Sequence, residues 1–510
     1  MNDRDSLNNN FDQSFPQIYD EPAEEKVPKT EPVISPDVSE TSSEEDVSSE
    51  EYISETDNSM EHPSKGKKSH HLFFTISAII LICFFGIISY TVSRTKLQTP
   101  PDLDEGQKTF LAATLYANYP QEVLKPLPYT FDSPELNVSA KAAIVLDAAN
   151  GCVLYEKNAD EVIPPASMQK LMVMYIVFSD IAAGKFSLTD TVPITPEASA
   201  KNAPPGSSLM GLHEGDLVTV DDLLMGMAIP SGNDAAVAIG NFVSGSTVAF
   251  IRRMNEEAAK LGLKNTFFAD ISGYSELNLT TPREFATFCR IYSLRFPDAM
   301  KRYNGAEEMH YPLAKNIGVG AQPRETRTLK STNKLLSIIP GCDGLKTGYI
   351  PESGYNFSFT AKNGSSRVIA ILMGGKGSNR AEGDKYRISD ISAIANWFYG
   401  NFETLPTSQN RRWAVKVWGG EDNSVYLTES LNTAITVPNM MKNAVENVQE
   451  TVEIPRNLSA PIEAGTEYGK IVYRLGNNVL QEIPLVADRN IEEGSLVKKF
   501  LDDIAHVFVQ

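Results

Sequence analysis

A serine hydroxyl and a lysine amine three residues apart can act as a nucleophile and its general base, because residues i and i+3 share one face of a helix. The pattern Ser-x-x-Lys occurs five times, beginning at Ser64, Ser93, Ser167, Ser331 and Ser495. Ser167 and Lys170 stand between a proline-containing turn, Pro164-Pro165-Ala166, and an uncharged apolar run at 171–178. We therefore expect Ser167 in the first turn of a largely buried helix, where burial shifts the Lys170 amine toward its neutral, basic form.

Two further motifs follow in order along the chain. Ser231-Gly232-Asn233 lies 64 residues after Ser167, and Lys346-Thr347-Gly348 lies 115 residues after Ser231. Each tripeptide alone can arise by chance, but all three motifs in this order and context are a strong signal of one catalytic site. Two structural interpretations stay open here. Ser231 could be the N-cap of the helix that follows, and Asn233 could be a turn residue.

At these motifs the sequence resembles the penicillin-binding D-alanyl-D-alanine carboxypeptidases, which are serine peptidases that trim peptidoglycan stem peptides. The likeness extends from about Ala140 to the C-terminus. It rests on the segments Ala140-Lys141-Ala142-Ala143, Pro165-Ala166-Ser167-Met168-Gln169-Lys170, Pro230-Ser231-Gly232-Asn233-Asp234-Ala235-Ala236, Asp343-Gly344-Leu345-Lys346-Thr347-Gly348-Tyr349 and Gly354-Tyr355-Asn356. Near the end of the chain, Val415-Lys416-Val417-Trp418 and Ala460-Pro461-Ile462 look like the C-terminal β domain of that family.

The resemblance implies a role for each matching residue. Ser167 would attack the carbonyl of the terminal D-Ala-D-Ala bond, and Lys170 would take its proton. Ser231 would relay a proton to the departing D-alanine, while Asn233 would position Lys170. The substrate-binding residues would be Lys346 and Thr347 for the carboxylate, Gly348 for close approach of the strand, the backbone N–H groups of Tyr349 and Ser167 for the oxyanion, and Arg380 for added positive charge. β-Lactams, which mimic the dipeptide, would acylate the same serine.

A β-lactamase is the nearest enzymatic alternative, because it shares the serine and lysine motifs. Class A β-lactamases, which the pattern also resembles, carry a deacylating Glu four residues before an Asn, whereas this chain has Tyr274 four residues before Asn278. Gly232 stands where those enzymes usually carry Asp. Both departures favour the carboxypeptidase, and we expect acylated penicillin to leave the serine slowly.

A binding or scaffold protein that kept the fold is an alternative of a different class. Such a protein would recruit partners through its acidic N-terminal tail. A chain that had lost catalysis would be expected to have lost at least one motif residue. The complete set opposes this interpretation: Ser167, Lys170, Ser231, Asn233, Lys346 and Thr347.

Composition excludes further classes of function. The formal net charge is −19, of which −12 lies in residues 1–69, so the other 441 residues carry −7. A mildly acidic folded part does not fit nucleic acid as a partner. The four cysteines and six histidines show no metal-ligand spacing, so we expect neither a metal nor a cofactor. Cys342, four residues before Lys346, is expected to be a small packed residue rather than a reactive thiol.

The sequence of the N-terminal region predicts a disordered tail followed by a membrane anchor. Residues 1–69 are acidic and polar, which predicts a disordered tail. Residues 72–93 contain no charged residue over 22 positions, enough to span about 30 Å of hydrocarbon, so we predict a transmembrane helix at 70–93 rather than a cleavable signal peptide. A weak excess of lysine before this segment places the tail in the bacterial cytoplasm and residues 94–510 on the extracytoplasmic side of the cytoplasmic membrane.

The elements that must hold the motifs form an α+β pattern. A hairpin is expected at 140–156, helices are expected from Ser167, after Thr219-x-x-Asp222 and from Asn233, and strands return at 354–361 and 367–373. After a juxtamembrane linker at 94–130, this order predicts a catalytic domain at 131–405 with helices beside an antiparallel sheet. The resemblance implies the penicillin-binding, β-lactamase-like transpeptidase fold for this domain.

The pattern after residue 405 changes to short strand-like runs, which predict a small β domain at 406–510. Its last segment, 495–510, is predicted to be an amphipathic helix. One face carries Val497, Phe500, Leu501, Ile504 and Phe508, and the other carries Lys498, Lys499, Asp502 and Asp503. This helix could lie on the outer membrane surface, as in resembling proteins, or pack against the β domain.

Overall fold

The computed structural model describes residues 68–118, 124–130, 135–318, 320–407, 411–430, 434–439 and 445–507. Nearly all of the predicted acidic tail lies outside the described residues. The described part of the chain divides into two compact units. Residues 97–494 form one unit, and residues 68–96 join 495–507 in the other.

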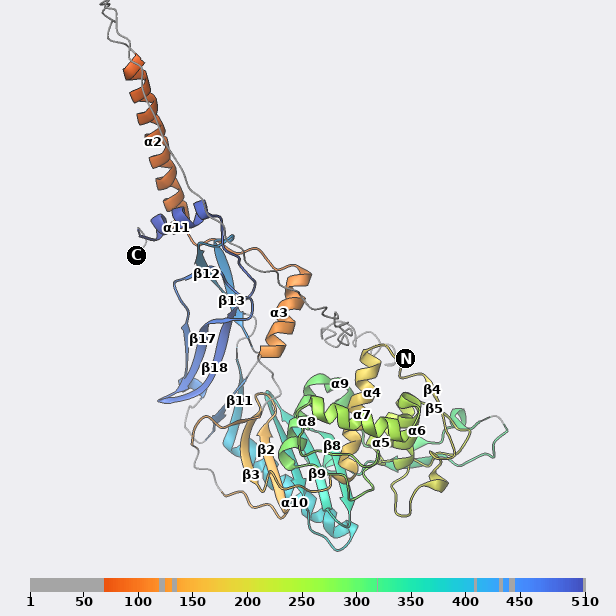
Figure 1. The fold of residues 1–510 in the computed structure, drawn as a ribbon. Coiled ribbons are helices and arrows are strands. Elements are labelled where there is room, and N and C mark those ends of the chain that lie inside the picture. Colours follow the sequence, from red (N-terminus) through yellow and green to blue (C-terminus); the bar gives the residue numbers. More distant parts are fainter. Residues whose placement is uncertain are drawn as a thin grey trace, which may run out of the picture. The chain divides into compact units, whose positions relative to one another are not determined.

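A six-stranded sheet organises the first part of the unit 97–494, in the order β1-β3-β2-β10-β9-β8 (Figure 1). Neighbouring strands are antiparallel except β1 and β3, which are parallel. The predicted hairpin is confirmed as β2 and β3, and the predicted later strands are β9 and β10. The bounds are β1 Lys125–Pro126, β2 Ala142–Asp147, β3 Cys152–Lys157, β8 Cys342–Ile350, β9 Gly354–Asn363 and β10 Ser366–Met373.

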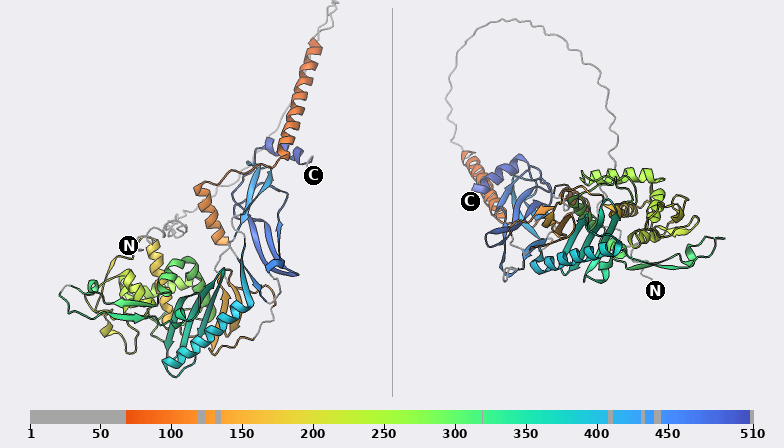
Figure 2. Two further views of the ribbon diagram at one scale, coloured as in Figure 1. Left: turned by 180° about the vertical axis from the view of Figure 1, so that it is seen from behind. Right: turned by 90° about the horizontal axis from the view of Figure 1, so that it is seen from below.

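Both faces of this sheet are covered, which follows from the alternation of side chains along a strand. In β10, one alternate set joins an apolar core shared with α10 (Arg380–Asn401), and the other set joins a core shared with the helices between β3 and β8. The first set is Val368, Ala370 and Leu372, and the second is Ile369, Ile371 and Met373. Figure 2 shows α10 and the other helices around the sheet from two further sides.

The helical part lies between β3 and β8 in the sequence. Its helices are η1 Ala166–Gln169, α4 Lys170–Ala182, α5 Val220–Ala228, α6 Asn233–Ser244, α7 Thr247–Lys260, α8 Pro282–Arg295 and α9 Pro297–Ala299. Two small antiparallel sheets of two strands each accompany them, β4 Thr191–Pro193 with β5 Leu217–Thr219, and β6 Glu308–Tyr311 with β7 Arg327–Lys330. The predicted capping box at the start of α5 is confirmed, because the Thr219 and Asp222 side chains each bond the other's backbone N–H.

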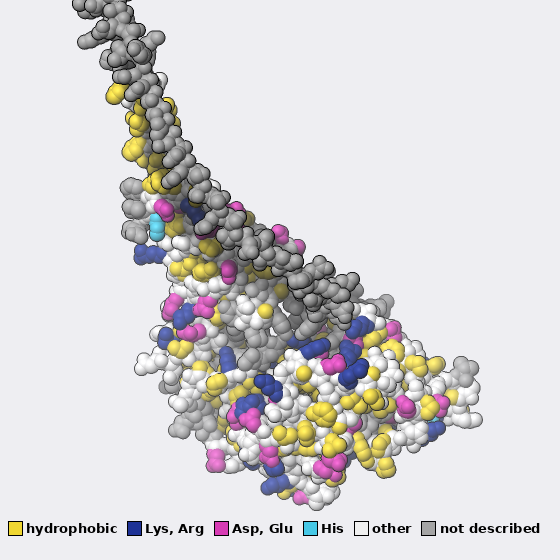
Figure 3. Space-filling model, in the orientation of Figure 1, with side chains coloured by type: hydrophobic (Ala, Val, Ile, Leu, Met, Phe, Trp, Pro, Cys, Tyr) yellow, Lys and Arg dark blue, Asp and Glu magenta, His cyan; other side chains and the backbone are white. Residues whose placement is uncertain are grey.

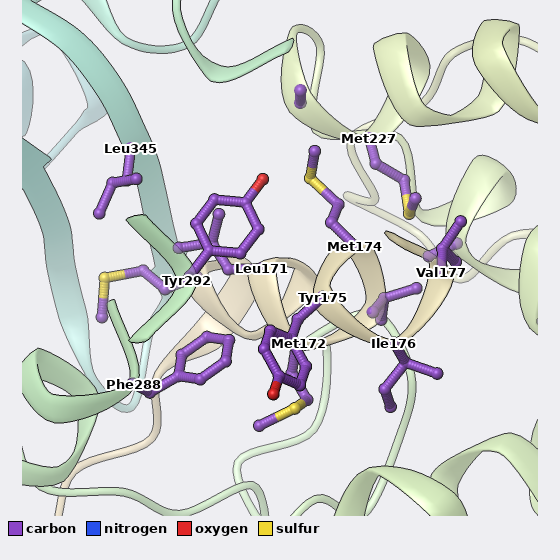
Figure 4. Close-up of a cluster of buried hydrophobic side chains, with 14 of the residues drawn as sticks. Leu171, Met172, Met174, Tyr175, Ile176, Val177, Met227, Phe288, Tyr292 and Leu345 are labelled. Atoms are coloured by element: carbon purple, nitrogen blue, oxygen red, sulfur yellow. The ribbon is translucent and has the colours of Figure 1, made fainter. Parts of the chain in front are cut away.

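Helix α4 is buried on all sides, as the uncharged run after Lys170 predicts. None of residues 171–178 exposes more than 1% of its surface. Figure 4 shows α4 among aromatic side chains of α8, such as Phe288 and Tyr292, with Met227 of α5 and Leu345 of β8 nearby. A helix packed in this way holds the residues at its N-terminus in fixed positions.

The β-rich region after residue 405 is also confirmed, and with it the α+β fold class with a C-terminal β domain. A six-stranded sheet has the order β15-β17-β18-β13-β12-β16, and β11 pairs with β14 beside it. The bounds are β11 Phe402–Pro406, β12 Arg412–Trp418, β13 Ser424–Glu429, β14 Ala434–Pro438, β15 Val448–Glu453, β16 Asn457–Ser459, β17 Glu467–Leu475 and β18 Asn478–Ala487. In the segment predicted as a linker, residues Glu105–Asn118 form helix α3, which the sequence patterns did not predict.

Within the described residues, the second unit contains the helices α2 (Lys68–Thr95) and α11 (Leu496–Val507). Within α2, the segment Phe73–Arg94 is long and apolar enough to cross a membrane. Hydrophobic side chains cover the visible part of α2 (Figure 3). Helix α11 packs against α2, an arrangement that the sequence analysis did not consider. Phe508, predicted on the apolar face of the last helix, lies outside the described residues.

Candidate active site

Ser167 lies in the helical turn η1, directly before α4, close to the position that the sequence predicts. The preceding Ala166 has φ of +49°, a left-handed conformation that residues with a Cβ rarely adopt. A Cβ at Gly273 would lie 2.1 Å from the Ala166 carbonyl oxygen. Glycine at position 273 therefore lets the loop 270–275 lie directly against the backbone of the serine.

The Lys170 amine is the centre of the site, and its side chain is fully buried. Its Nζ lies 2.9 Å from Ser167 Oγ, 2.8 Å from Asn233 Oδ1 and 2.5 Å from the Ser272 carbonyl oxygen. Burial lowers the pKa of Lys170 from 10.5 to about 7. A neutral amine can donate to the Asn233 and Ser272 oxygens and still direct its lone pair at the Ser167 hydroxyl, as a general base requires.

The carboxylate of Asp270 shapes the loop that brings the Ser272 carbonyl to Lys170. Its Oδ1 accepts the backbone N–H groups of Ser272 and Gly273 at 2.6 and 2.8 Å. Its Oδ2 accepts the backbone N–H of Ser275 at 2.7 Å and Asn278 Nδ2 at 2.7 Å. Burial alone would raise the pKa of Asp270, but these hydrogen bonds outweigh it and hold the pKa below its usual range. Asp270 is therefore a positioning residue that sequence reasoning missed.

We expect Asp270→Asn to lower kcat/KM about 10- to 100-fold, because an amide offers one acceptor oxygen fewer to the loop and a displacement of about 1 Å at a catalytic group has an effect of that order. The matched control is Glu276→Gln, which removes an exposed charge from the same loop. D-Alanine release measured beside the thermal unfolding midpoint separates loop displacement from unfolding. An Asp270→Asn enzyme with parental kcat/KM would contradict this role.

Ser231 is buried, with 3% of its surface exposed, and its φ is +64°. Its Oγ has no hydrogen-bond partner among the described residues. The N-cap of α6 is Gly232, without a side-chain capping bond, so the interpretation of Ser231 as an N-cap is wrong. An unpaired buried hydroxyl is rare enough to need an explanation, and a substrate group is a suitable partner. Asn233, the first residue of α6, contacts Lys170 as described above, which a simple turn residue would not explain.

The third motif lies on the edge strand β8. Lys346 is buried, and its Nζ donates to the Thr347 carbonyl oxygen at 3.1 Å. The pKa of Lys346 is well below its usual range. Burial is the largest cause, and the positive charges of Lys170 and Arg387 add to it. A Cβ at Gly348 would lie 2.6 Å from the Pro165 carbonyl oxygen, so glycine allows β8 to approach the turn that carries the serine.

Tyr349 and Arg380 differ from the buried members of the predicted set. The Tyr349 ring is half exposed and stacks on Tyr355, with 4.3 Å between ring centroids. Arg380 is exposed at the first position of α10. Neither side chain is part of the buried network around Lys170 in the described residues. Tyr349 can still contribute through its backbone N–H, as the resemblance implies.

Arg387, two turns further along α10, is a buried cation that the sequence analysis missed. Its charge is one cause of the lowered pKa of Lys346. It forms an ion pair with Asp384. A small cavity is lined by Thr332, Lys334, Leu335, Thr347, Phe357, Asp384, Arg387 and Ile388. The sequence did contain a signal for the burial of Arg387. Arg387 lies on the buried face of α10, with Asp384 three residues before it and Ile391 four residues after it.

Cys342 is partly buried at the start of β8. Burial raises the pKa of its thiol to about 11, so the reactive thiolate is scarce at neutral pH. This agrees with its interpretation as a packed small residue.

Comparison with known proteins places this geometry in a family. Residues 129–377 match the family described as D-alanyl-D-alanine carboxypeptidase, and residues 404–493 match the C-terminal domain of penicillin-binding protein 5. D-Alanyl-D-alanine carboxypeptidase DacC of Escherichia coli is 33% identical over 389 residues, which cover 75% of this chain and 91% of that protein. The chain belongs to the D-alanyl-D-alanine carboxypeptidase family. It is therefore an enzyme, a hydrolase of the peptidase class.

Other members of the family agree with this assignment. D-Alanyl-D-alanine carboxypeptidase DacF of Bacillus subtilis is 30% identical over 364 residues, which cover 71% of this chain and 88% of that protein. Among solved structures, penicillin-binding protein 5 of Haemophilus influenzae superimposes with a TM-score of 0.61 at 28% identity, covering 71% of this chain and 99% of the other. The likeness includes the C-terminal β domain, which argues against a β-lactamase.

Proposed function

We propose that this carboxypeptidase removes the terminal D-alanine from peptidoglycan stem pentapeptides through an acyl-enzyme on Ser167, and that it acts in cell-wall biogenesis and remodelling. The observation that carries the proposal is the buried Lys170 amine, 2.9 Å from Ser167 Oγ, with a pKa lowered to about 7. The test is D-alanine release from a peptide ending in D-Ala-D-Ala by the full chain in detergent. A peptide ending in D-Ala-L-Ala is the matched control, from which release of L-alanine is measured. Equal rates of release of the terminal alanine from the two peptides would overturn the proposal.

Acylation begins when Ser167 Oγ attacks the carbonyl carbon of the penultimate D-alanine. The hydroxyl proton moves to Lys170 Nζ as the C–O bond forms. The backbone N–H groups of Ser167 and Tyr349 stabilise the oxyanion. As the C–N bond breaks, Ser231 relays the proton from Lys170 to the amine of the departing D-alanine, which leaves the lysine amine neutral. The unpaired Ser231 hydroxyl supports this relay.

Deacylation returns the enzyme to its starting state. Water attacks the ester carbonyl as the Lys170 amine takes up its proton. When the ester C–O bond breaks, that proton passes from Lys170 to Ser167 Oγ, and the shortened stem peptide leaves with a new carboxylate. β-Lactams present a cyclic amide to the same serine and form the corresponding ester. The Asp270 carboxylate accepts backbone N–H groups of its own loop, and Tyr274 stands where class A β-lactamases carry the deacylating Glu, which supports slow release of the penicilloyl group.

The C-terminal carboxylate of the substrate needs cations and hydroxyl donors. Lys346 and Thr347 provide both on β8, where the strand approaches Ser167. We include Arg387 in this carboxylate site, because its guanidinium is buried over the Tyr355 ring of β9, it lines a small cavity together with Thr347, and its charge acts on Lys346. Arg380, the arginine chosen from the sequence, is exposed at the helix end and is the weaker candidate.

We expect Arg387→Gln to lower kcat/KM about 10- to 100-fold for peptides ending in a free carboxylate, in line with the loss of a charge-assisted hydrogen bond or ion pair. The loss should be larger than for the matched variant Arg380→Gln. Asp384 keeps its ion pair with Lys334 at 2.7 Å, so the variant does not leave a buried carboxylate unpaired. A larger loss in Arg380→Gln than in Arg387→Gln would reverse the assignment of the two arginines.

We also propose that the chain is a single-pass protein of the bacterial cytoplasmic membrane, with residues 94–510 extracytoplasmic and the acidic tail cytoplasmic. The span Phe73–Arg94 and the location of peptidoglycan outside that membrane support this orientation. Protease added to intact spheroplasts should digest the catalytic domain and spare an N-terminal epitope. Protection of the catalytic domain would reverse the orientation.

A further inference from the structure

A buried ion pair joins the two ends of the described chain. Arg94, in the last turn of α2, donates from Nε and Nη2 to the two carboxylate oxygens of Asp502 in α11, at 2.7 and 2.8 Å. The Tyr90 hydroxyl donates to the same carboxylate at 2.6 Å. The Arg94 and Asp502 side chains are 4% and 1% exposed. Helix α11 crosses the end of α2 in Figure 1 and in the left-hand view of Figure 2.

Helix α11 meets α2 through a residue of its charged face. Asp502 was expected on the solvated side of an amphipathic helix, yet it is buried, whereas Val497 and Phe500 of the apolar side are largely exposed. A hydrophobic contact alone would have turned the helix the other way. The bidentate geometry of Arg94 fixes both the distance and the orientation of the carboxylate, so it can specify the position of α11 on α2.

The contact lies where α2 ends as a membrane span. Tyr90 and Arg94 are four residues apart and share one face of the helix. Arg94 is the last residue of the apolar segment Phe73–Arg94. Tyrosine and arginine are residue types that occupy membrane boundaries, where an apolar body and a polar group are both satisfied. Removing one partner of a buried ion pair in such surroundings leaves an uncompensated charge, which disfavours the docked arrangement strongly.

We propose that α11 is a docking element for the end of the chain's own membrane helix, and that the Arg94–Asp502 pair is the lock that holds it there. The C-terminus is then kept at the membrane boundary by a specific protein contact, and not by lipid contact of an amphipathic helix alone. The unit 97–494 is then connected to the membrane helix from both of its sequence ends. The chain directly before residue 97 is α2 itself, and the chain directly after residue 494 is α11, which docks on α2. This inference does not depend on the proposed reaction.

Charge reversal tests the Arg94–Asp502 ion pair in the full chain reconstituted in lipid nanodiscs. Hydrogen exchange of the backbone amides of α11 is measured in the parent, Asp502→Arg, Arg94→Asp and the double variant that exchanges the two charges. We expect at least tenfold faster exchange in each single variant and recovery of most of the protection in the double variant. Asp503→Arg, a neighbouring exposed position on the same helix, should exchange like the parent.

Each other outcome overturns the proposal. Unchanged exchange in Asp502→Arg would mean that lipid contact alone holds α11. Equal acceleration in Asp503→Arg would mean that any added positive charge loosens the helix. Failure of the double variant to recover protection would show that the pairing of residues 94 and 502 does not hold α11 in place. D-Alanine release from a soluble peptide, unchanged in Asp502→Arg, shows in the same samples that the catalytic unit is folded.

Discussion

Replacing Ser167 with alanine is expected to abolish D-alanine release and labelling by a fluorescent penicillin, with a fall in kcat/KM of about 10⁴-fold or more, as for the nucleophile of other serine hydrolases. The reason is that the variant keeps Lys170, Asn233 and the fold but has no oxygen 2.9 Å from the lysine amine to accept the acyl group. Steady-state assays of the full chain in detergent, together with gel fluorescence after penicillin treatment, measure both losses. The unfolding midpoint should stay close to that of the parent, because one partly exposed hydroxyl is removed.

A second serine of the same local pattern is the natural control. Ser93 also begins a Ser-x-x-Lys sequence, but it is exposed on α2. Ser93→Ala should therefore keep the parental rate and the parental labelling. Penicillin labelling that survives in Ser167→Ala would place the nucleophile elsewhere, and labelling without D-alanine release in the parent would indicate a penicillin-binding protein without carboxypeptidase turnover.

The sequence predicted the central part of the site because its residues lie close to one another along the chain or in motifs of fixed order. Ser167 and Lys170 are three residues apart, and burial of Lys170 follows from the apolar run after it. The burial of Lys170 depends on local spacing, which a sequence records directly. The approach of β8 at Gly348 was instead implied by the resemblance to the family, and the hydrogen of this glycine leaves room for the Pro165 carbonyl.

The features that the sequence did not predict depend on tertiary packing. Arg380 and Arg387 are on the same helix, and only the fold shows that Arg387 is buried against β9 whereas Arg380 is exposed. Asp270 looked like a loop residue, and its role arises from backbone N–H groups that converge on it only after folding. The burial of Asp502 likewise depends on Arg94, a residue 408 positions away. In each case the burial or the hydrogen bonds of the residue depend on groups that only the fold brings next to it.

The low pKa of Lys170 connects the fold with the reaction. Full burial under the loop 270–275 removes water from the amine and favours its neutral form. The charges of Asp270 and Asp234 act in the opposite direction and favour the ammonium form. Both carboxylates are occupied by backbone N–H groups, of the loop after Asp270 and of Met210 and Gly211 near Asp234. The balance leaves the amine able to change its protonation state near neutral pH.

This balance predicts the pH profile of acylation. Lowering the pH below about 7 protonates Lys170, so kcat/KM should fall about tenfold per pH unit on the acid side and level off above pH 7. Lys170→Gln, which has no base at this position, should be about 10² to 10⁴ times slower and lack this limb. Stopped assays of D-alanine release between pH 5.5 and 9 measure the profile. A parental kcat/KM that still rises about tenfold per pH unit up to pH 9, as for a lysine of ordinary pKa near 10, would contradict the buried amine as the base.

The variant Asp270→Asn tests two effects of this carboxylate, the sign of its contribution to the pKa of Lys170 and its effect on the position of the loop. Removing this negative charge withdraws a contribution that raises the pKa of Lys170, so the acid limb should move to lower pH even while the plateau falls. A purely structural defect would lower the plateau and leave the limb in place. A limb that moved to higher pH would show that water had entered beside the amine, because renewed hydration favours the ammonium form more than the lost carboxylate did.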